Sequence, residues 1–228
     1  MHRIIFLSLL LAAMPSLSLA GVVTVPAATG GDFSIKVKSL KELRFRTVIR
    51  QQFDFSCGSA ALATLLAYHY EDKVNEQDVF KEMFDRGNQD KIRREGFSLL
   101  DIKNYLVARG YRADGFRTSL DKLGTIGVPA IVLINHNGYR HFVVVKGLSG
   151  REVLLGDPAA GLKRMARADF EPMWNGILFL IRNKKEVAQG TFNRSGEWSA
   201  NGKAPLGMAM ENSDLARVTF LLPGSNDF

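Results

Sequence analysis

The most informative residue of this chain of 228 residues is its single cysteine, Cys57. It lies in the stretch FDFSCGSAALATLL, where a loop gives way to a run with helical spacing. A thiol at the start of a helix faces free backbone N–H groups and the positive end of the helix dipole, and both stabilise a thiolate. A buried structural cysteine would more naturally lie mid-helix, so the position favours a nucleophile over an inert thiol or an intermolecular link.

A nucleophilic thiol needs a base, and the chain offers few candidates. There are four histidines, and His2 falls in an N-terminal leader. His69 lies near the far end of the cysteine helix, which favours a packed or capping role. His136 falls in the turn sequence NHNG, where we expect a solvated side chain. His141 begins the apolar run HFVVV, an unusual place for a polar ring, and we predict that it is the base; the alternative is a histidine satisfied at a sheet edge.

Asp157 is the predicted partner of His141. The turn signal Ser149-Gly150 separates two short apolar runs, and an antiparallel pair centred on residue 149 places residue 157 opposite residue 141 to within one residue. Directly opposed Cα atoms lie about 4.5–5.5 Å apart, near enough for a carboxylate to orient an imidazole and to stabilise its cation. Pro158 then ends the strand. The alternative for Asp157 is an ordinary aspartate that starts a turn.

These residues must be positioned by helices in the first half of the chain and by strands in the second. Helical spacing and capping residues predict helices over 57–70, 75–84, 98–110 and 120–126. Short apolar runs predict strands over 130–134, 142–145, 153–155 and 177–181, with a hairpin turn at Asn137-Gly138. Helices followed by antiparallel strands indicate an α+β fold in which N-terminal helices pack on an antiparallel sheet.

The two ends of the chain differ from this central part. Residues 1–20 have a positive start, an apolar run and small residues before Gly21, the pattern of a cleavable signal peptide. The apolar run is shorter than the roughly 20 residues of a membrane-spanning helix, so we expect no integral span after cleavage. We interpret residues 21–44 as an N-terminal arm, with strand-like alternation over 33–48. Residues 45–182 form the predicted main domain.

Residues 183–228 are rich in Gly, Asn, Ser, Lys and Pro. We predict that they form a C-terminal extension of low order, with one strand-like run over 218–222.

The composition, with 46% hydrophobic and 23% charged residues, is that of a globular protein and argues against disorder and against a polytopic membrane protein. The net charge of +7 favours acidic partners. Nucleic acid is not an expected partner, because no finger, RNP motif or basic helix with interleaved aromatics is present. No cofactor is expected, and one cysteine with dispersed histidines lacks the spacing of a metal site.

At the level of motifs, the chain resembles the C39 peptidases, papain-like cysteine proteases that cut leader peptides after double-glycine sites. Gln51, six positions before the Cys57-Gly58 pair that opens a helix, resembles their active-site segment. The runs HFVV from His141, DPA from Asp157 and WNG at 174–176 are similar to their later motifs in the same order. The resemblance covers roughly residues 45–182 and implies a papain-like fold. It also implies that Gln51 donates to the oxyanion alongside the backbone N–H of Cys57.

Two departures from that family pattern bear on function. Ser56 stands where many members carry Asp, and the sequence has no P-loop or spanning helices, unlike members fused to ATP-driven exporters. The chain resembles instead the free-standing periplasmic C39-like proteins. This implies a periplasmic cysteine peptidase that cleaves a secreted protein and supports export or assembly of functional amyloid. Its expected partners are amyloid subunits and their outer-membrane exporter.

Two other functions are compatible with the same residues. One is a non-catalytic C39-like domain that binds an exported or amyloid-forming client. The other is acyl transfer or amide hydrolysis on cell-wall peptides, because the same triad serves both reactions. Degenerate domains of this kind usually lose the cysteine, so its retention favours the peptidase. The export signal leaves double-glycine specificity open, because the substrate would be a secreted protein met outside the cytosol.

Overall fold

The computed structural model describes residues 22–26, 32–36 and 39–200, which fall into two compact units. In the first unit, β1 (Val22–Pro26) and β2 (Asp32–Lys36) pair as an antiparallel hairpin. The second unit begins at Lys41 and contains all the candidate site residues. The predicted signal peptide and the strand-like run over 218–222 lie outside the described residues.

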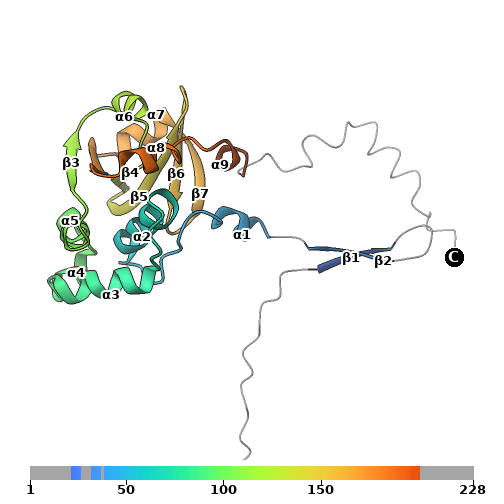
Figure 1. Ribbon diagram of the computed structural model, residues 1–228, viewed down its shortest axis with the longest axis horizontal. Coiled ribbons are helices and arrows are strands. Elements are labelled where there is room, and N and C mark those ends of the chain that lie inside the picture. The colour runs from blue at the N-terminus through green and yellow to red at the C-terminus, as the bar shows by residue number, and fades with distance from the viewer. Residues whose placement is uncertain (1–21, 27–31, 37–38, 201–228) are drawn as a thin grey trace, which may run out of the picture. The chain divides into compact units, whose positions relative to one another are not determined.

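A six-stranded antiparallel sheet forms the centre of the second unit (Figure 1). Its strands lie in the order β3-β8-β4-β5-β6-β7. The strands are β3 (Ala113–Arg117), β4 (Ala130–His136), β5 (Tyr139–Leu148), β6 (Glu152–Asp157), β7 (Gly161–Ala166) and β8 (Ile177–Ile181). The predicted turn joins β4 to β5, with Asn137 and Gly138 at φ 51° and 89°, as a type I′ hairpin requires. The predicted strands are confirmed, while the edge strands β3 and β7 were not predicted.

The helix that begins at Cys57, α2 (Cys57–His69), is the central helix of the unit and packs on β5. Its alanines and leucines surround the whole circumference, and nearly all of its residues are buried. A helix that is apolar on every side needs partners on every side. The sheet supplies one of these partners, and α3 (Glu76–Arg86) and α5 (Leu99–Ala108) supply others.

Side-chain caps explain where the shorter helices begin. Asn75 and Ser98, the predicted N-caps, accept hydrogen bonds from the backbone N–H groups of Asp78 and Asp101. Asn88 and Ser119 cap α4 (Gln89–Glu95) and α6 (Leu120–Ile126) in the same way. Helix α4 was not predicted from the sequence.

The ends of the second unit also depart from prediction. The strand-like alternation predicted over 33–48 is confirmed at its start by β2, but residues 40–44 form α1 (Leu40–Arg44), whose sequence LKELR consists of good helix formers. Where low order was expected, the chain forms α8 (Lys185–Gln189) and α9 (Ser195–Ala200), anchored by the buried residues Ala188 and Glu197. Between β7 and β8 lie α7 (Arg167–Phe170) and the 3-10 turn η1 (Glu171–Met173).

Among the described residues, no helix combines the length and apolar character needed to cross a bilayer.

Candidate active site

Cys57 is the first residue of α2 and is only 6% exposed. The preceding turn is fixed by Ser56, whose hydroxyl accepts from the N–H of Phe53 (3.1 Å) and donates to its carbonyl (3.0 Å). Ser56 therefore does not cap α2 with its side chain. The first N–H groups of the helix thus keep their capacity to donate to an anion beside the thiol.

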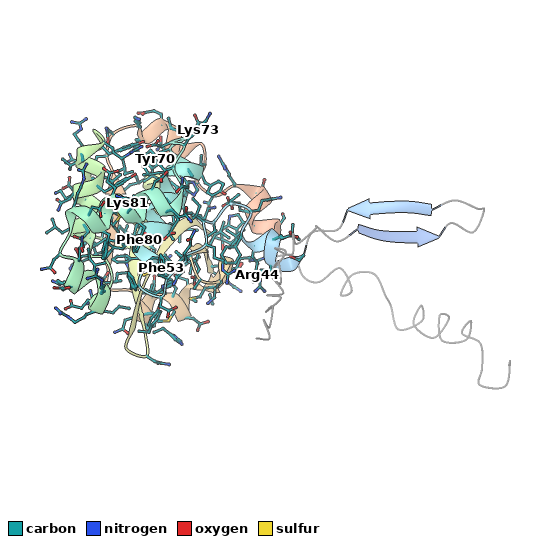
Figure 2. The ribbon with its side chains drawn as sticks, turned by 90° about the horizontal axis from the view of Figure 1, so that it is seen from below. Arg44, Phe53, Tyr70, Lys73, Phe80 and Lys81 are labelled. Carbon is teal, nitrogen blue, oxygen red and sulfur yellow. The ribbon has the colours of Figure 1, made fainter. Side chains whose placement is uncertain are left out.

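An aromatic cluster supports this turn from the outside. Phe53 lies beside Phe80 of α3 (Figure 2), with ring centroids 5.2 Å apart. Phe55 contacts both rings. Such contacts contribute about 0.5–1.5 kcal/mol per aromatic pair beyond burial. The loop before Cys57 is therefore packed against α3.

A second hydrogen-bonded group lies beneath the start of α2. The Ser59 hydroxyl lies 2.9 Å from the carbonyl of Ser56 and 3.1 Å from Oε1 of Glu76. Glu76 is 3% exposed, and burial raises its pKa against the opposing hydrogen bonds of Ser56 and Ser59. A single hydroxyl proton cannot serve two acceptors, so a protonated Glu76 that donates from Oε1 to Ser59 lets the Ser59 hydroxyl donate to the carbonyl of Ser56. Oε2 of Glu76 is buried without a hydrogen-bond partner among the described residues.

His141 and Asp157 are joined by a short hydrogen bond. Nε2 of His141 lies 2.7 Å from Oδ1 of Asp157, and the two side chains are 6% and 13% exposed. Asp157 also accepts from the N–H groups of Ala159 (2.8 Å) and Ala160 (3.2 Å) in the turn that follows β6. The carboxylate is thus held by the backbone on one side and presented to the imidazole on the other.

The predicted register of the two strands is wrong, although the predicted contact forms. Val144 lies opposite Gly156, and continuing this register places Asp157 opposite Val143, two residues from His141. The loop of this hairpin spans residues 149–152, and β5 carries a bulge between Val145 and Gly147, so the pairing is shifted. His141 and Asp157 are therefore diagonal neighbours, which long side chains can still bridge.

The electrostatics of the pair favour an imidazolium. Burial would lower the pKa of His141, but the hydrogen bond to Asp157 and the proximity of Cys57 outweigh it and raise that pKa to about 9. Burial opposes ionisation of Asp157, yet His141 and the two backbone donors hold its pKa below the ordinary value. The effect of Cys57 on the pKa of His141 places its thiol close to the imidazole, and Nδ1 is the ring nitrogen that makes no hydrogen bond within the described residues.

The other two histidines among the described residues make no hydrogen bond to His141 or Asp157. Nδ1 of His69 is 2.7 Å from the Thr191 hydroxyl, and its ring is fully buried, in agreement with a packed role. Burial, then Lys146 and Arg194, lower the pKa of His69, which favours the neutral ring. His136 is exposed, as predicted.

Gln51 lies between the two halves of the site. Its backbone N–H donates to the carbonyl of Pro158 (3.0 Å), which ties the loop before Cys57 to the turn after Asp157. Its side-chain Nε2 donates to the carbonyl of Phe53 (3.1 Å). An amide has two N–H donors, so one remains for a ligand.

Tyr139 is a site residue that the sequence analysis missed. Its ring stacks on His141 with centroids 5.7 Å apart and is 54% exposed. Residues two apart on a strand share a face, so the position of Tyr139 two residues before His141 could have predicted that the two side chains lie together.

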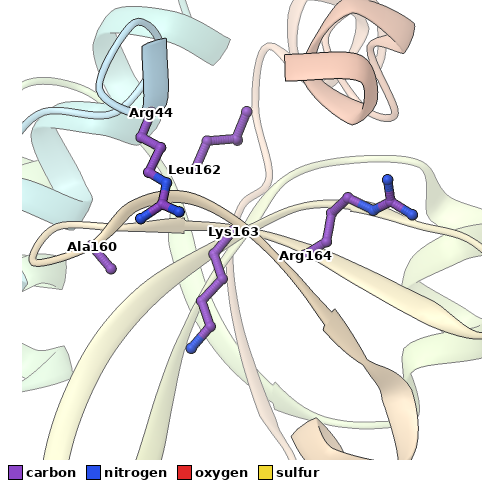
Figure 3. Close-up of a pocket in the computed structure, with 5 residues that line it drawn as sticks. All are labelled: Arg44, Ala160, Leu162, Lys163 and Arg164. Atoms are coloured by element: carbon purple, nitrogen blue, oxygen red, sulfur yellow. The ribbon is translucent and has the colours of Figure 1, made fainter. Parts of the chain in front are cut away.

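An open cleft of about 870 Å³ begins at this pair. It runs from His141, Asp157 and Tyr139 along β7 to α7 and η1, with Met165 and Met173 among its apolar lining residues. Lys163 and Arg164 line both this cleft and an adjoining smaller pocket that also contains Arg44 of α1 (Figure 3). The cleft therefore combines apolar walls with a cationic end.

A thiol at a helix start, an imidazole bonded to a buried carboxylate and an open cleft beside this pair are the arrangement of a cysteine peptidase of α+β fold. The chain belongs to the peptidase C39 family, whose model matches residues 46–186.

Among its relatives is the "Probable functional amyloid protease FapD" of Pseudomonas fluorescens, 43% identical over 79% of this chain and 80% of the relative. The protein of the same name from Pseudomonas aeruginosa is 42% identical over 78% of this chain and 79% of the relative. A double-glycine motif protease solved with a leader peptide is 30% identical, with a TM-score of 0.49, over 59% of this chain and 89% of that one.

Proposed function

We propose that Cys57 is the nucleophile of this peptidase, that His141 is its acid-base partner and that Asp157 orients His141. The observation that carries the proposal is the 2.7 Å bond between His141 and Asp157, with Nδ1 of the same ring left unbonded near the thiol. A cationic imidazole beside a thiol favours the thiolate, which is the attacking species.

In the proposed reaction, the Cys57 sulfur attacks the scissile carbonyl carbon and the carbonyl oxygen takes up negative charge. The backbone N–H of Cys57 and the side-chain amide of Gln51 donate to this oxygen. His141 then gives its proton to the departing amine as the C–N bond breaks, leaving a thioester on Cys57. A water molecule, deprotonated by His141, attacks the thioester and releases the carboxylate product and the thiol.

The proposed client is a secreted protein that the chain meets in the periplasm, where cleavage supports export or assembly of functional amyloid. Support comes from the two FapD relatives, whose name links the protease to functional amyloid, and from the signal-peptide pattern of residues 1–20. Amyloid subunits and their outer-membrane exporter are the corresponding partners. The cationic end of the cleft, with Lys163 and Arg164, and Arg44 in the adjoining pocket suit a client with acidic residues.

Chemical labelling of protein N-termini tests the proposal directly. Secreted and periplasmic proteins from a strain that lacks this chain are incubated with wild-type protein or with Cys57→Ala, and new N-termini are identified by mass spectrometry. We expect new N-termini in an amyloid subunit or another secreted protein with wild type and none with Cys57→Ala. Cleavage that persists in Cys57→Ala, or after complete alkylation of Cys57, would disprove the assignment. Recovery of the chain from the periplasmic fraction with Gly21 at its N-terminus checks the localisation.

A further inference from the structure

The edge strand β3 lies at one end of the sheet and pairs with β8 alone. Two hydrogen bonds, one at each end of the strand, show which residues of β3 bond to β8. Arg182 donates its N–H to the carbonyl of Arg112 (2.6 Å), and Thr118 donates to the carbonyl of Gly176 (3.2 Å). In this register, even-numbered residues of β3 bond to β8, so the odd-numbered residues direct their N–H and C=O groups away from it.

The opposite strand supports this alternation. Phe179 of β8 lies across from Gly115 and pairs on its other side with Ile131 of β4. Its backbone groups therefore point away from β3, as those of Gly115 point away from β8. Gly115 and Arg117 are exposed, whereas Ala113 is buried. Two residues thus present free N–H and C=O groups at an edge that no other described segment pairs with.

An apolar groove of about 450 Å³ lies beside this edge. Phe116 is 40% exposed and forms part of its floor with residues of β8 and α6. The apolar lining residues are Phe116, Ile126, Val128, Leu180 and Ile181. An open strand edge next to an exposed apolar surface is a template for another strand, which native proteins usually cover or block.

The rim of the groove is cationic. It carries Arg117, Lys122, Arg182 and Lys185. The neighbouring acid Asp114 is already paired with Lys103 (2.7 Å) and Arg182 (3.1 Å). Lys122 and Lys185 form no ion pair among the described residues. The charge of the rim is therefore complementary to an acidic ligand.

We propose that the β3 edge and this groove form a docking site for an extended acidic segment of the protein client, which adds a strand to the sheet. The proposal rests on the proposed function, because it gives the client a second contact outside the cleft. A polypeptide supplies N–H and C=O groups at the two-residue repeat of Gly115 and Arg117, which a lipid or a nucleic acid does not. Three strand spacings, about 14 Å, separate β3 from β5, so one client can occupy both places.

The test measures binding to the Cys57→Ala protein, so that cleavage cannot affect the result. The probe is a fluorescein-labelled decapeptide of alternating valine and glutamate, followed by fluorescence anisotropy at low salt. Gly115→Pro removes the outward N–H and places the ring at the edge without removing a bond to β8. Gly115→Ala is its matched control, since it adds a Cβ that would lie 3.3 Å from Ile177 but keeps the N–H. The double variant Lys122→Glu and Lys185→Glu tests the rim, with Lys73→Glu and Lys91→Glu as its control.

We expect Gly115→Ala to bind like the parent, and Gly115→Pro and the rim variant to bind at least about tenfold more weakly, a difference of about 1.4 kcal/mol. A valine-lysine decapeptide should not compete. Unchanged binding in folded Gly115→Pro and in the rim variant would overturn the proposal; so would binding of anionic lipid vesicles but not of the peptide. If Gly115→Pro does not fold, the proposal is tested by the rim variant and by the comparison of the valine-glutamate and valine-lysine peptides. If the parent Cys57→Ala protein does not bind the valine-glutamate peptide while wild-type protein still cleaves secreted proteins, the docking site alone is refuted. If the peptide binds but wild-type protein cleaves no secreted protein, the peptidase assignment alone is refuted.

Discussion

Oδ1 of Asp157 lies 2.7 Å from Nε2 of His141, although the two residues are not directly opposed in the ladder between β5 and β6. The diagonal contact leaves Nδ1 on the side of the thiol, while the turn after β6 supplies two backbone donors that keep the carboxylate ionised. Each proposed role therefore depends on this one bond.

Replacing Asp157 by Asn should reveal that dependence in the pH profile. Asn keeps an oxygen for the N–H groups of Ala159 and Ala160 but removes the negative charge that raises the pKa of His141 to about 9. We expect a loss of about 10²-fold or more in kcat/KM and an alkaline limb that moves from near pH 9 to lower pH. The control is Asp90→Asn, an exposed position on α4. An unchanged alkaline limb would show that Asp157 does not set the charge of His141.

The same pair contributes to stability with a defined sign. The pKa of His141 in the folded state lies above the unfolded value of about 6.5. Its contribution is therefore complete below pH 6.5 and is lost as the pH rises toward 9. Asp157→Asn should flatten this part of the curve of unfolding free energy against pH.

Gly161 holds the turn that presents Asp157. It pairs with Asp157, has φ 82°, and an added Cβ would lie 2.8 Å from the carbonyl oxygen of Arg44. Gly161→Ala should therefore lower the free energy of unfolding by about 1–3 kcal/mol, because both the backbone conformation and the approach of α1 are strained. The matched control is Gly150→Ala, where an added Cβ meets open space. Equal unfolding midpoints in urea for the two variants would contradict this account.

The sequence was informative where the signal is local. The start of α2 at Cys57 and the order of His141 and Asp157 follow from neighbouring residues. The register does not, because the turn is centred between Gly150 and Arg151 rather than at Ser149, and the bulge in β5 then moves the pairing back by one residue. That bulge is stabilised from the C-terminal segment. Asn193 donates its N–H to the carbonyl of Lys146 (3.0 Å) and accepts at its side chain from the N–H of Leu148 (2.7 Å). Such pairing between distant segments leaves no periodic pattern to detect.

The role of Glu76 also depended on packing. Its position predicted only an acidic residue in the first turn of α3, and the contact with Ser59 arises because α3 packs against α2.

Glu76→Gln should therefore preserve activity, because the amide donates to Ser59 as a protonated carboxyl does. Glu76→Ala leaves Ser59 without this partner and should cost about 1–3 kcal/mol of unfolding free energy, with a lower kcat. The raised pKa of Glu76 means that wild type loses stability as the pH rises through its titration, whereas the Gln variant does not. Urea unfolding at pH 4 and pH 7 checks this prediction. Relative to wild type, Glu76→Gln should have a higher free energy of unfolding at pH 7 than at pH 4. No such gain would indicate an ionised Glu76.

The C-terminal segment is joined to the β5 bulge by a buried ion pair. Nζ of Lys146 donates to Oε1 of Glu197 (2.7 Å) and to the carbonyl and hydroxyl of Thr47 (2.7 and 2.9 Å), and the Lys146 side chain is completely buried. Burial lowers the pKa of Lys146 to about 8, against the opposing effect of Glu197.

Lys146→Met leaves Glu197 buried without its partner and should reduce the free energy of unfolding by about 3–5 kcal/mol. The double variant with Glu197→Leu should recover most of that loss, because two apolar side chains replace two buried charges. The bulge sets the register that makes His141 and Asp157 diagonal neighbours, so the single variant should also lower kcat while the double variant restores it. Because the folded pKa of Lys146 lies below the unfolded value of about 10.4, wild type should gain stability on the double variant between pH 8 and pH 10. Equal urea midpoints for the single and double variants at pH 7 would show that α9 is not held by this pair.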